Sequence, residues 1–147
     1  MNKVHVKLLM MAAVASLLFS NSIVAQVNPY APKTILPPEP RAAHVVISQG
    51  PELEIARANL AIIRWTTNNP GGTDVHYGIV HYGTNPNDLS QTAKNPIHLN
   101  RSHPDTTFRV RIDGLSPQTT YYYTVASEEG TGTNDGVKSG VKQFSTQ

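Results

Sequence analysis

Apolar and polar residues alternate along several short segments of this chain, which is typical of β-strands with one buried face. Residues 106–112 alternate most regularly, with Phe108 and Val110 on one face and two arginines on the other. Residues 59–67 follow the same period and place Trp65 on their apolar face. We expect Trp65 in the core, because a large ring is stabilised most by burial between two sheets.

Turn-forming residues separate these segments, and no segment shows a helical period. About seven strands are therefore predicted, in an all-β, antiparallel two-sheet sandwich. Residues 43–147, close to the ~100 residues of one immunoglobulin-like domain, are expected to form it. The first predicted strand covers residues 44–48 and continues over residues 52–56. The others are 59–67, one strand inside 75–83, and then 106–112, 121–127 and 137–146. Residues 128–136 are expected to form a loop.

A five-residue repeat lies before the middle of the domain: Val75-His76-Tyr77-Gly78 is followed by Val80-His81-Tyr82-Gly83. An odd separation places the two copies on opposite faces of a regular strand. We therefore expect a β-bulge at Gly78, or a strand that starts there, and we expect Tyr82 to have a structural role. A second bulge is expected between Val141 and Phe144, where the inward-facing positions change parity.

A turn followed by an aromatic strand gives the strongest indication of the fold. Leu115, Pro117, Thr119 and Tyr121 have the spacing of the tyrosine corner of fibronectin type III-like and immunoglobulin-like sandwiches. In such a corner the tyrosine hydroxyl bonds to the backbone just upstream. Tyr123 lies on the same strand face as Tyr121, so we expect both rings in the core. The alternative is that Tyr121 is only packed in a strand.

The first 25 residues have the features of a secretory signal peptide. Lys3 and Lys7 precede an apolar run over residues 8–19, and we expect cleavage after the small residue Ala25. An uncleaved anchor is the alternative, but about a dozen apolar residues are few for a hydrocarbon core of ~30 Å. We therefore expect a periplasmic or secreted protein with no stable membrane anchor after cleavage.

Cleavage would also change the charge of the protein. The chain has 12 basic and 10 acidic residues, and residues 1–25 hold two lysines and no acid, which leaves 10 of each. A neutral domain has no general attraction to nucleic acid, so we expect no nucleic-acid partner. Residues 26–42 contain five prolines and are expected to form an extended spacer. The absence of cysteine excludes a disulfide scaffold.

Four motifs together carry a family resemblance. They are Ile-Arg-Trp-Thr-Thr at 63–67, His-Tyr-Gly-Thr-Asn-Pro at 81–86, Gly-Leu-Ser-Pro at 114–117 with three tyrosines at 121–123, and Phe-Ser-Thr at 144–146. With them, residues 43–147 resemble the fibronectin type III-like N-terminal domain of purple acid phosphatases. In that family a metallophosphoesterase domain follows, and its two metal ions activate a water. The chain contains no Gly-Asp, Gly-Asn-His or Gly-His-x-His motif, so the resemblance implies no catalytic residue here.

The remaining polar residues also give no indication of catalysis. A metal site needs three or four converging ligands, whereas two pairs of histidines are five residues apart and would diverge on a regular strand. We expect hydrogen-bonded or solvated histidines, with a cross-strand metal site as the alternative. Ser102, His103 and Asp105 are too close in sequence to form a catalytic relay. We therefore predict no catalytic residue, metal ion or cofactor. The histidines after residue 25 are His44, His76, His81, His98 and His103.

A binding surface is easier to predict than a reactive one. If the strands pair as in related sandwiches, Arg64, Arg109 and Arg111 share one outer face with Leu60 and Ile62. Arginine beside apolar surface is typical of binding patches. The alternative is an ordinary solvated face that the Pro-rich spacer partly covers.

The expected function is that of an exported, non-catalytic accessory or binding module. Its partner would be a protein, an extracellular polymer or a separately encoded enzyme, bound through the arginine face or through loops 68–74 and 128–135. One alternative is a truncated or split purple acid phosphatase with acid phosphatase and metal-binding activity. Another is a structural subunit of a surface assembly that pairs through an open sheet edge.

Overall fold

A computed structural model describes residue 37 and residues 39–147. The predicted signal peptide, its cleavage site after Ala25 and most of the predicted spacer lie outside the described residues. Within residues 39–147 the chain forms eight strands and no helix, which confirms the predicted all-β sandwich. No helix of the described part is long and apolar enough to cross a membrane.

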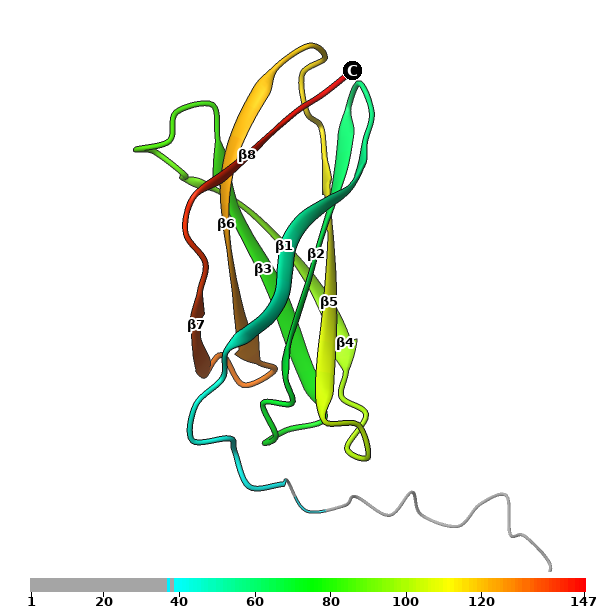
Figure 1. The fold of residues 1–147 in the computed structure, drawn as a ribbon, viewed down its shortest axis with the longest axis vertical. Helices are drawn as coiled ribbons and strands as arrows, with labels where there is room; N and C mark the ends of the chain where they lie inside the picture. The colour runs from blue at the N-terminus through cyan, green and yellow to red at the C-terminus, as the bar shows by residue number, and fades with distance from the viewer. Residues whose placement is uncertain (1–36, 38) are drawn as a thin grey trace, which may run out of the picture. The chain divides into compact units, whose positions relative to one another are not determined.

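The strands form two antiparallel sheets (Figure 1). The first has the order β1-β2-β5, and the second has the order β4-β3-β6-β7, with β8 also paired to β6. The strands are β1 (Ile47–Ala56), β2 (Leu60–Asn68), β3 (Val75–Gly83), β4 (Gln91–His98), β5 (Asp105–Asp113), β6 (Thr120–Glu129), β7 (Asn134–Lys138) and β8 (Lys142–Ser145).

The core lies between the sheets, where the alternating segments place their apolar side chains. Trp65 of β2 is 1% exposed and stacks on Phe108 of β5, with 5.2 Å between ring centroids. Burial of two large rings between sheets contributes a large share of the hydrophobic stabilisation of a domain of this size.

The prediction of a bulge or a strand start at Gly78 is wrong, because β3 begins at Val75. The pairing of β3 with β4 and with β6 continues through Gly78 without a register shift. Glycine is needed there for packing, because an added Cβ would lie 2.9 Å from Val110 Cγ2 and 3.1 Å from the rings of Trp65 and Phe108. The two copies of the repeat therefore face opposite sides of β3. His76 is buried in the interior, and His81 on the outer face is half-buried.

Several strand boundaries also differ from the prediction. Residues 137–146 form no single bulged strand, because residues 139–141 separate β7 from β8. β7 begins inside the predicted loop 128–136, and β1 continues through Gly50 and Pro51 with register shifts against β2. β4 was not predicted, because its sequence is largely polar and includes a proline, which only an edge strand tolerates.

Candidate functional site

The predicted corner residues form a tyrosine corner at the turn between β5 and β6. The Ser116 backbone N–H donates to the Tyr121 hydroxyl at 3.0 Å, and the Tyr121 ring stacks on Phe144 at 5.6 Å between centroids. Leu115 is buried beside it, whereas Pro117 is exposed on the turn.

Two further predicted structural residues, Tyr82 and Tyr123, are also buried in the core, 8% and 2% exposed. Burial raises the pKa of both phenols, because an ionised ring would lose its hydration. These residues stabilise the sandwich and offer no reactive group at its surface.

Removal of the corner hydroxyl gives a direct test of its contribution. Tyr121→Phe is expected to lower the free energy of unfolding by about 0.5–1.5 kcal/mol, because the Ser116 N–H loses its acceptor. Urea denaturation measures the change. The control is Tyr122→Phe, since Tyr122 is half-buried on the same strand and its hydroxyl makes no hydrogen bond to the described residues. Equal losses in the two variants would contradict a specific role for the corner.

The five residues of the predicted binding face do lie together on the outer side of the β1-β2-β5 sheet. Arg64 pairs in register with Arg109, and Ile62 with Arg111, while Leu60 and Ile62 are half-buried. Each arginine is bound to a carboxylate, however. These ion pairs are Arg64–Glu52, Arg109–Glu54 at 2.7 Å and Arg111–Asp113 at 2.8 Å.

The ion pairs change what this face can do. The hydrogen bond from Arg109 lowers the pKa of Glu54, so the carboxylate stays ionised and compensates the guanidinium. The three arginines of this face are therefore all compensated by carboxylates. Exposed ion pairs of this kind contribute little to the free energy of unfolding. Residues 39–42 of the predicted spacer bond to a loop at one end of the sandwich.

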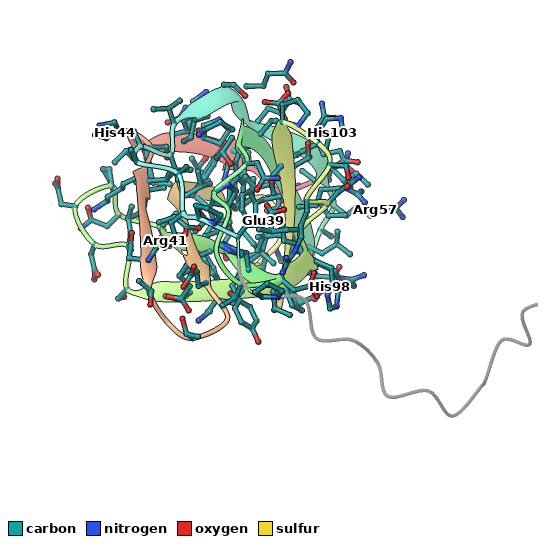
Figure 2. The ribbon with its side chains drawn as sticks, turned by 90° about the horizontal axis from the view of Figure 1, so that it is seen from below. Glu39, Arg41, His44, Arg57, His98 and His103 are labelled. Atoms are coloured by element: carbon teal, nitrogen blue, oxygen red, sulfur yellow. The ribbon has the colours of Figure 1, made fainter. Side chains whose placement is uncertain are left out.

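One end of the sandwich is built from four segments that are linked to one another. We call it the loop end: residues 39–42, 69–74, 99–104 and 130–133. Figure 2 looks onto it and labels Glu39, Arg41 and His103 among its side chains. Hydrogen bonds join these segments, and residues 39–42 take part both in hydrogen bonds and in ion pairs.

Backbone and amide hydrogen bonds fix two of the junctions. Glu39 and Gly72 exchange backbone hydrogen bonds at 3.1 and 3.0 Å, and the Ala42 N–H donates to the Pro70 carbonyl at 2.8 Å. The Asn69 side-chain amide donates to the carbonyls of Asn100 (3.1 Å) and His103 (2.9 Å). These hydrogen bonds hold the segments in fixed positions relative to one another, so the loop end is a preorganised surface.

A charge cluster whose members are buried except for Arg41 lies beneath the loop end. His76 Nδ1 is 3.0 Å from Asp135 Oδ2, and both side chains are 0% exposed. Asp135 Oδ1 is 3.4 Å from Arg41 Nη2, and Arg41 Nε is 3.5 Å from Glu129 Oε1. Thr131 Oγ1 donates to the second Glu129 oxygen at 3.2 Å. The cluster therefore joins the entering chain to β3, β6 and β7.

Both ring nitrogens of His76 have an oxygen partner. Its Nε2 lies 3.0 Å from the Gly71 carbonyl oxygen, which can only accept a hydrogen bond. Its Nδ1 lies 3.0 Å from Asp135 Oδ2. The buried ring therefore has a hydrogen-bond partner at each nitrogen, as a buried polar group requires.

Sequence reasoning missed this cluster. His76 and Asp135 are 59 residues apart, and Asp135 lies in the segment predicted as a loop. The local signal was the repeat: an odd spacing on an unbulged strand must place one of its two histidines inside, where it needs partners.

The loop end also has an open hollow of about 440 Å³. Its lining includes Glu39, Pro40, Asn69, Arg101 and His103. Arg101 donates to the Pro37 carbonyl at 2.8 Å, and His103 Nδ1 is 3.0 Å from the Asp105 carbonyl. Within the described residues no three acidic, histidine or cysteine side chains are placed to hold a metal ion. The hollow therefore presents a concave surface with hydrogen-bonding groups to a binding partner.

Comparison with known proteins agrees with the architecture. The sequence pattern of a family described as "Purple acid Phosphatase, N-terminal domain" matches residues 49–146. The chain belongs to this family. The match covers the N-terminal domain of purple acid phosphatases and includes no catalytic domain, which confirms the resemblance found in the sequence. No curated protein matches the chain significantly.

Three solved structures similar to this purple acid phosphatase N-terminal domain are forms of one protein, the sensor domain of the anti-sigma factor RsgI4 in Pseudobacteroides cellulosolvens. The long form is 18% identical, with 70% of this chain and 87% of that chain covered and a TM-score of 0.45. A solution structure of the sensor domain is 19% identical, with 70% of this chain and 74% of that chain covered and a TM-score of 0.46. The short form is 19% identical, with 77% of this chain and 97% of that chain covered and a TM-score of 0.45. Likeness at this level concerns the fold alone.

Proposed function

We propose that this protein is an exported, non-catalytic module that binds a protein or an extracellular polymer, or docks onto a separately encoded enzyme. The observation that carries the proposal is the loop end. Four segments are cross-linked there by hydrogen bonds and a charge cluster, around an open hollow. A surface that is already ordered loses little conformational entropy when a partner binds.

The loop end is a better candidate than the arginine face. Sandwich domains often bind through loops that a rigid scaffold holds in place. The arginines of the face are occupied by Glu52, Glu54 and Asp113, so a partner would first have to displace these carboxylates. Family membership supports the non-catalytic part of the proposal, because the match is confined to the N-terminal domain of the phosphatases.

A phosphatase assay tests that part. The full-length protein is incubated with p-nitrophenyl phosphate at acidic and neutral pH, with Fe, Zn or Mn added. We expect no turnover above that of the metal ions alone. Turnover that needs the protein and is abolished by a chelator would contradict the proposal.

A truncated or split purple acid phosphatase is the second candidate, and membership of the phosphatase family favours it over other enzyme classes. Chelator-sensitive turnover in the same assay would support this candidate directly. Under the leading proposal, any phosphatase activity belongs to a separate polypeptide that the module accompanies.

A further inference from the structure

We propose that the open side of the sandwich, between edge strand β1 and edge strands β7 and β8, binds an extended segment of another protein in which apolar and acidic side chains alternate. We call this surface the seam: residues 45–53 and 136–142. It is distinct from the hollow of the loop end, and its function does not depend on the function proposed above.

The first observation is the position of the exposed apolar side chains. Among the described residues three large apolar side chains are exposed: Val46 (58%), Leu53 (40%) and Val141 (51%). Leu53 pairs in register with Ile63, which is fully buried, so it belongs to the inward face of its sheet. It is exposed because the second sheet does not cover this edge. Val141 lies on the opposite edge, between β7 and β8.

The second observation is a shared hollow. A hollow of about 230 Å³ is lined by Val45 and Val46, which precede β1, by Ile47 at the start of β1, and by Gly136, Val137 and Lys138 from β7. The two edges therefore form one surface, with apolar walls from both sheets. Contiguous exposed apolar surface in a domain of this size is typical of an interaction site.

The third observation is free backbone. β1 pairs only with β2, while β7 and β8 pair only with β6, so each strand has one side without strand partners (Figure 1). β1 contains Pro51 and three register shifts, features that hinder pairing. A bound segment would therefore pair with β7 and β8 and pack its apolar side chains against β1.

Charge defines the chemistry of the segment. Lys138 and Lys142 are exposed on this edge, and neither contacts a carboxylate of the described chain. The nearby acid Glu52 on β1 is held by Arg64. Lysines on an edge strand repel an identical edge, which disfavours pairing of two copies. The same charges attract an acidic strand, so the seam selects against self-association and for an acidic partner.

Two synthetic peptides test the proposal on the full-length protein. One alternates valine and glutamate over eight residues, and the other alternates valine and lysine. We expect the glutamate peptide to shift the backbone amide NMR signals of β7, β8 and the start of β1, and the lysine peptide to leave them unchanged. Lys142→Glu should weaken binding of the glutamate peptide about tenfold or more, because it places like charges opposite each other.

The matched control is Arg57→Glu, which reverses another exposed cation without an ion-pair partner, at the turn before β2. It should leave the affinity for the glutamate peptide within about twofold, as expected for a charge outside the site. Equal binding of the two peptides, shifts confined to the loop end, or no shifts at millimolar peptide would each overturn the proposal. Concentration-dependent dimerisation through the seam would overturn it as well, because the occupant would then be a second copy.

Discussion

Asp135→Ala is expected to lower the free energy of unfolding by about 1–3 kcal/mol, because it leaves the buried His76 Nδ1 without its hydrogen-bond partner. His76 and Asp135 are fully buried, and His76 Nδ1 has no other acceptor in the described chain. Arg41 also loses part of its attachment, because its Nη2 lies 3.4 Å from Asp135 Oδ1. Urea denaturation at neutral pH, followed by circular dichroism, measures the change.

Two controls separate this effect from ordinary loss of a side chain. Asp113→Ala removes the same group from an exposed pair with Arg111 and should change stability little. The double variant with His76→Gln and Asp135→Asn keeps hydrogen-bonding groups at both buried positions, so it should be more stable than Asp135→Ala. A cost for Asp135→Ala as small as that of Asp113→Ala would contradict a specific role for the buried pair.

Trp65→Ala is expected to cost about 3–5 kcal/mol, because it opens a cavity at the centre of the core. The indole stacks on Phe108 and lies 3.1 Å from the position of a Cβ at Gly78. Close packing from both sheets leaves no small movement that would refill the space. Thermal and urea denaturation followed by circular dichroism give the loss, since the variant has no tryptophan fluorescence.

Trp65→Phe is the matched control for the cavity. It keeps an aromatic ring against Phe108 and removes the indole N–H, which is buried without a hydrogen-bond partner in the described structure. Because an unsatisfied donor is itself costly, its removal offsets part of the lost packing. We expect less than half of the loss seen with alanine. Equal losses in the two variants would show that the indole has a role other than filling space.

The two stability predictions concern different parts of the proposed binding module. The Trp65 variants test the sandwich itself, whereas the Asp135 variant tests the cluster that holds residues 39–42 against the loops. A protein that keeps its core but loses the cluster should retain its strands while the loop end becomes more accessible to proteases. That outcome would show that the charge cluster keeps the loop end ordered.

The alternation of β5 and β6 and the corner spacing are local patterns, so they could be recognised without coordinates. Periodicity fixes which side of a strand faces the core, and this predicted Trp65, Tyr121 and Tyr123 as interior residues. It also predicted that the arginines of β2 and β5 share one face. It did not indicate their acidic partners, because Glu52 and Glu54 come from a third strand whose register includes shifts.

The sequence by itself determined the class of fold and the family, because both depend on residues that are neighbours along the chain. Only the tertiary structure decided why Gly78 is glycine, that His76 is buried against Asp135, and that Val46, Leu53 and Val141 remain uncovered at the seam. Each of these features arises where segments distant in sequence meet. Distance between such segments is set by how the two sheets pack, and no local period encodes it.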